Sequence, residues 1–286
     1  MIEYAVVGIE EQYSTAYAIA RKKQYNDNET DQEEQTEMEI GAQFYTVRDL
    51  CRTTEGLAET LKKVADIGYK TVQLSGTCPY DAEWMKQQLA ANGLRCVLTH
   101  IPMPRLTGET GQVIRDHEVI GCDHIGLGYY SFDEEKGDSF DRFVSAVHPV
   151  ARAFREAGKL FMYHNHDQEF KKLNGRLILE QLAEVFPADQ MGFTLDTYWV
   201  QKGGGDPAQW LERLSGRIPV IHLKDYAYGA KMSVIGEGNI NFDRVFEKAE
   251  AGGTRFMMVE QDDCNGEDPL ECLRRSYAYL RSRGFD

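Results

Sequence analysis

The sequence predicts an α/β protein whose main domain, residues 38–286, is a closed (β/α)8 barrel. Short apolar, β-branched or aromatic runs typical of buried strands recur there, separated by longer segments with helical periodicity. Eight such strand–helix units within about 250 residues match a closed barrel better than an open sheet. The residues after the first run, QFYTVRD, also lack the glycine-rich phosphate-binding pattern of many open sheets. The predicted strands are residues 40–45, 70–75, 94–100, 122–128, 159–164, 191–196, 217–223 and 255–260.

The segments between the predicted strands carry both an apolar stripe and an end signal. In the first of them, Leu57, Leu61 and Val64 recur at helical spacing. A glycine follows five of the predicted helices and suits the left-handed conformation common at a helix end: Gly68, Gly93, Gly121, Gly158 and Gly253. Strands that alternate with helices pair in parallel through right-handed crossovers, so we expect one parallel sheet.

The first part of the chain differs from the rest in composition. Residues 26–39, NDNETDQEEQTEME, contain seven acidic residues and one apolar residue. Such a segment buries too little apolar surface to offset the entropy lost on ordering. We therefore expect residues 1–37 to form an acidic, poorly ordered N-terminal extension outside the barrel domain.

Charge and composition exclude several classes of protein. The formal net charge is −14 and the basic residues form no cluster, which argues against nucleic-acid binding. No run of about 18 apolar residues predicts a membrane span. The six cysteines form no CxxC pair, and Cys96 lies within an apolar run, which favours buried free thiols and a cytoplasmic location.

Polar and titratable residues stand where the later predicted strands end. The active site of a (β/α)8 barrel lies at the carboxyl ends of its strands, so these side chains should converge. Carboxylates and imidazoles brought together in this way need a cation between them. Ligands of this kind suit Mn²⁺, Mg²⁺, Co²⁺ or Zn²⁺. The residues at the strand ends are Gln43, Tyr45, His100, His164, His166, Glu169, Asp196, Trp199, His222, Lys224 and Glu260.

Each of these residues also has an alternative interpretation. His100 is compatible with a hydrogen-bonded core histidine, and Trp199 with either core packing or a wall that stacks on a sugar. Lys224 precedes Asp225 and is compatible with a simple ion pair between them. Asp196 follows an apolar run, and a buried carboxylate without a partner is strongly unfavourable, so a ligand is the better interpretation there.

Several segments together resemble the sugar phosphate isomerase/epimerase superfamily, the xylose isomerase-like TIM barrel group. The resemblance covers about residues 39–284. The group includes ketose 3-epimerases, inosose dehydratase, dehydroshikimate dehydratase and endonuclease IV. The segments that carry the resemblance are YHNHDQEF (163–170), GFTLDTYWVQKGGGDP (192–207), VIHLKD (220–225), IGEGNINF (235–242) and VEQDD (259–263).

The resemblance implies a divalent metal ion held by residues from strands five to eight. Asp196, His222 and Glu260 match the ligands of strands six, seven and eight. Strand five departs from the epimerase pattern, because His164 stands where epimerases have a glutamate. Either His164 is the fourth ligand or Glu169 takes its place. Mn²⁺ is the ion that we expect, with Mg²⁺, Co²⁺ and Zn²⁺ as alternatives.

The same resemblance implies an isomerase or epimerase acting on a keto-sugar or 3-keto-glycoside through an enediolate. Glu260 would transfer one proton, and His166 or Glu169 the other, while Lys224 would stabilise the developing negative charge. The alternatives are a lyase or dehydratase using the same chemistry, and a sugar-binding barrel without catalysis.

The expected partner is a small sugar molecule. Barrels of this type often form homo-oligomers, and the sequence is compatible with one. Substrate contacts are expected from Gln43, Tyr45, His100 and Trp199. The glycine-rich segment 235–242 is expected to close over the substrate.

Overall fold

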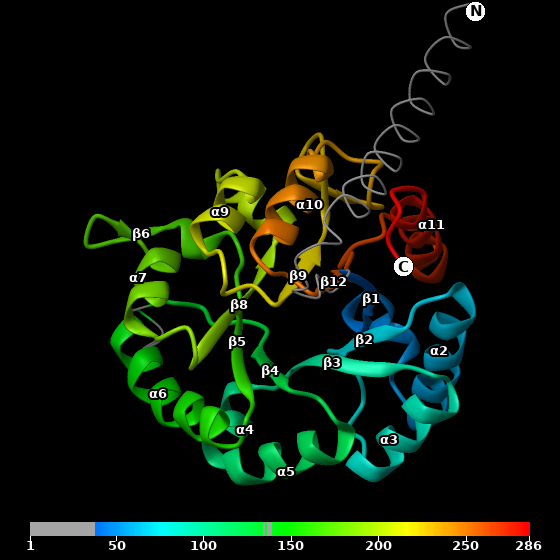
Figure 1. Cartoon of the computed structure of the whole chain (residues 1–286), viewed down its shortest axis with the longest axis horizontal. Coiled ribbons are helices and arrows are strands. Elements are labelled where there is room, and N and C mark those ends of the chain that lie inside the picture. Colours follow the sequence, from blue (N-terminus) through cyan, green and yellow to red (C-terminus); the bar gives the residue numbers. More distant parts are fainter. Residues whose placement is uncertain (1–37, 134, 136–138) are drawn as a thin grey trace, which may run out of the picture.

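The computed structural model describes residues 38–133, 135 and 139–286, and the predicted N-terminal extension lies outside these residues. The described chain forms a closed parallel barrel surrounded by helices, which confirms the predicted fold class (Figure 1). Around the barrel the strand order is β1-β12-β9-β8-β5-β4-β3-β2. The barrel strands are β1 (Glu39–Gln43), β2 (Thr71–Leu74), β3 (Arg95–His100), β4 (His124–Leu127), β5 (Leu160–His164), β8 (Met191–Asp196), β9 (Val220–Leu223) and β12 (Phe256–Val259).

Helices cover the outside of the barrel and begin and end where the sequence indicates. Thr53 caps the first of them, since its side chain accepts a hydrogen bond from the Gly56 amide at 3.1 Å. The five predicted end glycines all have positive φ, from 63° to 124°. The outer helices are α2 (Thr54–Ile67), α3 (Ala82–Ala91), α5 (Thr110–Ile120), α6 (Phe140–Glu156), α7 (Ile178–Val185), α9 (Pro207–Arg213), α10 (Phe242–Ala251) and α11 (Pro269–Ser282).

Short elements that the sequence analysis did not predict follow several barrel strands. Because they follow the carboxyl ends of these strands, they build up the side of the barrel where the site lies. Trp199 belongs to one of these elements. They are the 3-10 helices η1 (Phe44–Leu50) and η3 (Gln168–Phe170), the helices α4 (Met103–Gly108) and α8 (Thr197–Lys202), and two hairpins, β6 (Lys172–Leu173) with β7 (Arg176–Leu177) and β10 (Asp225–Ala227) with β11 (Lys231–Ser233).

The barrel interior is a packed core. Val97, Met162 and Met258 belong to one cluster of buried side chains, and Gly41 leaves the room that Met258 occupies. A Cβ at Gly41 would lie 2.5 Å from the Met258 sulfur, so a larger residue would displace the core. This packing fixes the strands that carry the site.

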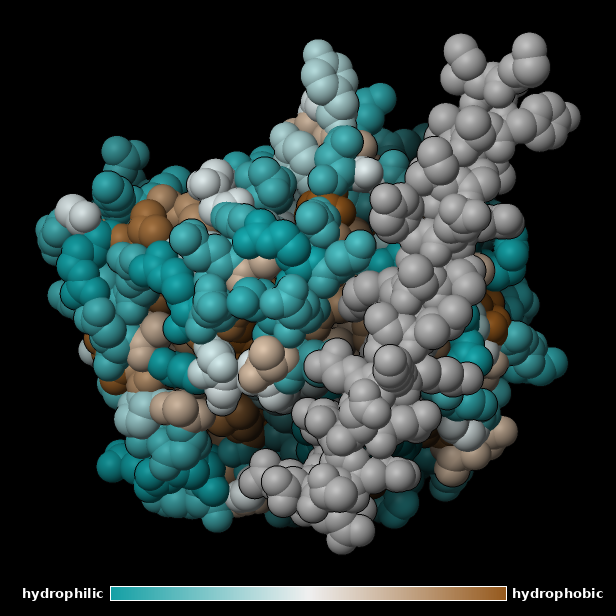
Figure 2. Space-filling view, turned by 45° about the horizontal axis from the view of Figure 1, so that its top comes forward, coloured by the Kyte–Doolittle hydropathy of each residue, from teal (hydrophilic) through white to brown (hydrophobic). Residues whose placement is uncertain are grey.

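The outer surface agrees with a barrel whose apolar residues are buried. The face shown in Figure 2 is covered mostly by hydrophilic residues, with hydrophobic residues visible only in small patches. Among the described residues, no helix combines the length and apolar character of a membrane span. All six cysteines are free, and Cys96 is buried as predicted.

Candidate metal centre

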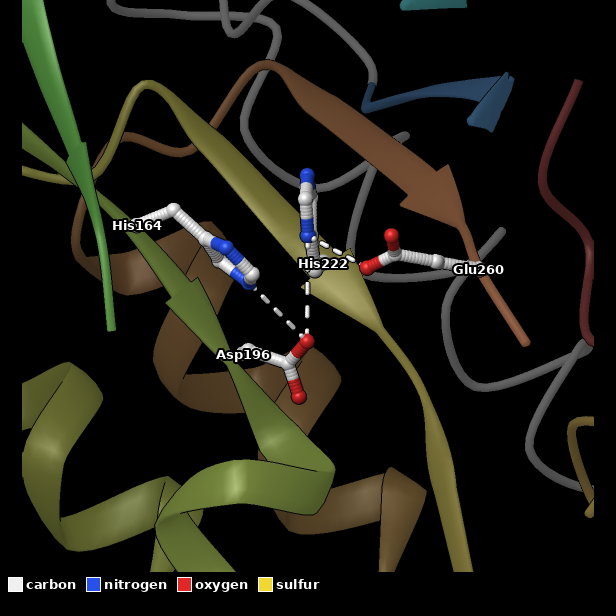
Figure 3. A group of neighbouring side chains, drawn as sticks. All are labelled: His164, Asp196, His222 and Glu260. Atoms are coloured by element: carbon white, nitrogen blue, oxygen red, sulfur yellow. Dashed lines mark hydrogen bonds and ion pairs between the residues drawn. The ribbon is translucent and has the colours of Figure 1, made fainter. Parts of the chain in front are cut away.

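Four side chains converge at the carboxyl ends of neighbouring strands β5, β8, β9 and β12. They are His164, Asp196, His222 and Glu260, all of which were predicted as ligands (Figure 3). One nitrogen or oxygen atom from each lies within 4.8 Å of the others, and all four residues are buried. The barrel therefore brings the predicted ligand set together.

Hydrogen bonds orient both histidines in the same sense. His164 Nδ1 lies 3.0 Å from the carbonyl oxygen of Gly128. A carbonyl only accepts, so Nδ1 carries the hydrogen and Nε2 keeps its lone pair. The side chain of Gln73 fixes the tautomer of His222 in the same way. Gln73 Oε1 lies 2.6 Å from His222 Nε2, so Nε2 carries the hydrogen and Nδ1 keeps the lone pair. Each histidine thus presents a lone pair toward the centre of the cluster.

The two lone pairs face carboxylate oxygens. His164 Nε2 lies 3.2 Å from Asp196 Oδ2, and His222 Nδ1 lies 2.8 Å from Glu260 Oε2. A lone pair facing an anion is repulsive unless a cation or a proton lies between them. A divalent ion at the centre satisfies both contacts at once, and the donor set of two imidazoles and two carboxylates fits such an ion. Burial alone would lower the pKa of His222, but Glu260 and Asp196 raise it above its ordinary value.

Each carboxylate has one oxygen held by the protein and one facing the cluster. Asp196 Oδ1 accepts the Trp199 amide hydrogen at 3.0 Å, which caps α8. Glu260 Oε1 accepts a hydrogen bond from the side-chain amide of Gln43. Burial alone would raise both pKa values, but the Lys224 ammonium holds the pKa of each carboxyl below its usual range. Both groups are therefore anionic.

Lys224 lies at the centre of the carboxylates. Its Nζ is 3.0 Å from Asp196 Oδ2, 2.9 Å from Glu260 Oε2 and 2.9 Å from Asp262 Oδ1. Burial opposes its charge, but the surrounding carboxylates raise the pKa of Lys224 above its ordinary value. The hydroxyl of Thr197 fixes the Lys224 backbone, accepting from its amide at 2.9 Å and donating to its carbonyl at 2.7 Å.

The alternative of an ion pair between Lys224 and Asp225 is wrong. Asp225 accepts backbone amide hydrogens instead, at 2.8 to 3.2 Å, from Tyr226, Gly236, Gly238 and Ile240. The carboxylate thereby holds the segment after β9 in a compact loop.

The glycine-rich segment 235–242 was expected to close over the substrate. None of its residues lines the cavity that lies next to the four-residue cluster, so the structure gives no support to this closure.

The structure also separates the two alternatives for strand five. Glu169 is buried, but its carboxylate accepts hydrogen bonds from the Tyr163 hydroxyl and the His166 amide, both at 2.6 Å. It belongs neither to the four-residue cluster nor to the cavity wall. The geometry therefore favours His164 over Glu169 as the fourth ligand, and it places Glu169 as a support for the backbone of His166.

A cavity of about 730 Å³ opens above the cluster. Tyr45 and Tyr129 on its wall are 38% and 58% exposed. His166 Nδ1 and Trp199 Nε1 are buried at the cavity and have no hydrogen-bond partner, so both are available to a ligand. The lining residues are Gln43, Tyr45, Ser75, His100, Ile101, Pro102, Met103, Pro104, Leu127, Gly128, Tyr129, His164, His166, Trp199, Lys224, Glu260 and Asp262.

All four predicted substrate-contact residues line this cavity. The side-chain amide of Gln43 donates a hydrogen bond to Glu260, whereas the buried Trp199 Nε1 has no hydrogen-bond partner. His100 combines both of its interpretations, because it lines the cavity and also hydrogen-bonds Gln73 Nε2 at 2.9 Å. Burial lowers the pKa of His100 well below its ordinary value, so the ring is neutral.

Sequence reasoning missed the groups that hold the cluster. Gln73 contacts His222 directly, Asn165 Oδ1 accepts the Asp196 amide hydrogen at 3.0 Å, and Asp262 reaches the cluster through Lys224. The signal for Gln73 was a polar residue inside an apolar strand run, and the signal for Asp262 was its place two residues after Glu260. Without the fold, neither signal identifies the residue that Gln73 or Asp262 contacts.

Comparisons with known proteins agree with this architecture. A family model described as xylose isomerase-like TIM barrel matches residues 61–283. The inosose dehydratase of Geobacillus kaustophilus (strain HTA426) is 24% identical over 166 residues. That match spans 51% of this chain and 52% of the dehydratase, so only about half of each protein is related in this way.

Solved structures show the same fold at low sequence identity. A sugar phosphate isomerase/epimerase from Parabacteroides distasonis ATCC 8503 has a TM-score of 0.73 and 23% identity, covering 86% of this chain and 94% of the other. An L-ribulose 3-epimerase has a TM-score of 0.70 and 16% identity over the same shares of the two chains. With a family model that matches more than half of its length, the chain belongs to the xylose isomerase-like TIM barrel family.

Proposed function

We propose that the protein is a divalent-metal-dependent sugar isomerase or epimerase that acts on a keto-sugar or 3-keto-glycoside through an enediolate. The observation that carries the proposal is the convergence of His164, Asp196, His222 and Glu260, with both histidine lone pairs directed at carboxylate oxygens. Mn²⁺ is the ion that we propose. When bound, it would polarise the substrate carbonyl as a Lewis acid and lower the energy of the enediolate.

The proton transfers are assigned to residues at the cavity. Glu260 takes one transfer, as predicted from the sequence, and His166 takes the other. His166 Nδ1 is buried at the cavity without a partner, which is the arrangement that a proton acceptor needs. Glu169, the other residue predicted for this transfer, holds the His166 amide instead.

The surroundings of His166 shift its pKa from the ordinary histidine value of 6.5. Burial, together with the nearby His164 and Lys224, lowers the pKa of His166 to about 2. The ring is therefore neutral at physiological pH, and one of its two nitrogens keeps a lone pair. An enediolate anion beside the ring would raise this pKa, so the proton affinity of His166 increases at the step that needs it. The Lys224 ammonium, on the cavity wall, would stabilise the same negative charge.

The size of the cavity favours a glycoside over a free ketose. The cavity of about 730 Å³ lies within the range of about 300–1,000 Å³ of pockets that hold drug-sized ligands, so it has room for a sugar that carries a further group. Apolar residues after β3 and β4, including Ile101, Met103 and Tyr129, line the remaining space. A sugar joined to an apolar group would fill both parts. The partner that we propose is thus a small molecule. The location that we propose is the cytoplasm.

A lyase or dehydratase is the second candidate. The similarity to inosose dehydratase favours it, and the same site serves it if proton removal is followed by loss of a leaving group at the neighbouring carbon. A sugar-binding barrel without catalysis is the third.

Proton exchange with solvent separates these candidates. The purified protein would be incubated in D₂O with Mn²⁺ and a panel of ketoses and 3-keto-glycosides, and followed by proton NMR. We expect deuterium at the carbon next to the carbonyl, and none with His222→Ala or Glu260→Ala. An inverted product identifies an epimerase, an aldose product an isomerase, and release of water or of an aglycone a lyase. Binding of a sugar without exchange would contradict the enzyme proposal.

A further inference from the structure

The Lys224 ammonium occupies the oxygens that a metal ion would use. Asp196 Oδ2 and Glu260 Oε2 are the carboxylate oxygens that face the two histidines, and Nζ lies 3.0 Å and 2.9 Å from them. Two cations on the same pair of buried oxygens repel each other strongly, because the surroundings screen them weakly. The ion and the ammonium therefore compete for these two atoms.

The charges around Lys224 indicate which partner it keeps. Asp196, Glu260 and Asp262 contribute three negative charges and Lys224 one positive charge, which leaves −2 (−3 + 1) among these groups. A divalent ion brings that sum to zero, and a buried site is most stable when its charges are compensated. Asp262 Oδ1 already lies 2.9 Å from Nζ and outside the four-residue cluster.

We propose that Lys224 is an internal competitor of the divalent ion and that Asp262 retains it when the ion is bound. In the metal-free protein, Nζ neutralises Asp196 and Glu260. When the ion enters, Nζ moves away from these oxygens and stays paired with Asp262, at the cavity wall that both residues line. Asp262 is then a positioning residue, and the ion must bind before Lys224 is free to contact a substrate. The inference rests on the metal ion of the proposed function and not on its sugar chemistry.

The flexible stem of lysine permits this exchange of partners. The Trp199 ring lies 5.5 Å from Nζ and offers a second favourable surface for the displaced charge. A second lysine provides a matched control. Lys202 Nζ lies 4.4 Å from the same ring and pairs with Asp167 at 3.2 Å, away from the ligand oxygens.

The affinity of the chelator-treated protein for Mn²⁺, measured by calorimetric titration, tests the inference. Removal of the competitor in Lys224→Met should tighten binding by about tenfold or more. In Asp262→Asn the ammonium loses its alternative partner, and binding should weaken by about tenfold. In the double variant the effect of Asp262→Asn should shrink, because there is no ammonium to retain. Lys202→Met should bind as the wild type does.

Thermal unfolding gives a second readout that does not depend on activity. In EDTA, Lys224→Met should melt below the wild type, because three carboxylates lose their counter-ion, and Mn²⁺ should raise its melting temperature by more than it raises that of the wild type. Unchanged or weaker Mn²⁺ binding in Lys224→Met would overturn the inference. If Lys224→Met fails to fold, Asp262→Asn decides instead, and an unchanged Mn²⁺ affinity in that variant would overturn the inference. If neither the wild type nor Lys224→Met binds Mn²⁺, the inference and the metal part of the proposed function both fail. If Mn²⁺ binds but no proton exchange occurs with any sugar, only the sugar chemistry of the proposed function is contradicted.

Discussion

The two halves of the barrel share one architecture but contribute differently to the site. Strands β5, β8, β9 and β12 supply the four residues of the candidate metal centre. Groups at the ends of β1, β2 and β4 supply none of them and contact them instead. Gln43 donates to the cluster glutamate, Gln73 accepts from one histidine, and the carbonyl of Gly128 accepts from the other. The later half carries the four residues, and the earlier half orients three of them, since the Trp199 amide of the later half holds Asp196.

The chemical types in the two halves explain this division. The orienting groups are two side-chain amides and a backbone carbonyl, all of them neutral. They fix the direction of a ligand without changing the charge at the centre, which the carboxylates and Lys224 determine.

The largest effect is expected from a change in the ligand half. Asp196→Asn keeps the shape of the side chain and an oxygen that can cap α8, but it removes the negative charge from the cluster. We expect Mn²⁺ affinity to fall by about a hundredfold or more, because a carboxylate ligand is replaced by a neutral one. Calorimetric titration measures the change. Asp206→Asn is the matched control, since Asp206 caps α9 in the same way outside the cluster, and equal effects of the two variants would contradict the assignment.

A smaller effect is expected from a change in the orienting half. Gln73→Leu leaves the Nε2 hydrogen of His222 without its acceptor at 2.6 Å, so the ring is free to change its tautomer. Loss of such an orienting group weakens metal binding by about 10- to 100-fold in comparable sites. The same titration checks this value. Gln87→Leu, on the exposed side of α3, should bind as the wild type does.

The smallest effect concerns a buried histidine of the earlier half that has no part in the cluster. His117 Nε2 lies 2.7 Å from the Thr99 hydroxyl and Nδ1 2.7 Å from the Val113 carbonyl, so neutral partners satisfy both nitrogens. Burial lowers the pKa of His117 from 6.5 to about 4, whereas carboxylates raise the pKa of His222. The same residue type thus responds in opposite ways at His117 and at His222.

The sign of the resulting pH dependence follows from this shift. Between the two pKa values the unfolded chain binds more protons at His117 than the native protein does. The full stability is therefore present above pH 6.5 and is lost as the pH falls toward 4. We expect His117 to account for at most about 2 kcal/mol of the loss in unfolding free energy between about pH 7 and pH 5. Urea unfolding at both pH values measures it, and a His117→Gln variant with the same pH dependence as the wild type would contradict the assignment.

The predictability of the site from sequence follows the same division. Asp196, His222 and Glu260 were predictable because each lies at or next to the end of an apolar run, and the fold brings such positions together. The carbonyl of Gly128 was not, because every residue has one and only the register of β4 and β5 brings it to His164.

Two further details depended on tertiary contacts that no local pattern records. Lys224 lies next to Asp225 in sequence, yet strand geometry directs the two side chains apart, toward the cluster and toward the loop. Trp199 lies in α8, whose first hydrogen bonds come from the Asp196 cap at the end of β8. The residue types alone could not separate a strand end from a short helix there.

The most direct test of the account is to locate the ion. Crystals grown with Mn²⁺ would be measured for anomalous scattering at the manganese edge. The account predicts one peak bonded to His164 Nε2, Asp196 Oδ2, His222 Nδ1 and Glu260 Oε2. The absence of a peak among these atoms at saturating Mn²⁺, or a peak bound by Glu169 in place of His164, would contradict it.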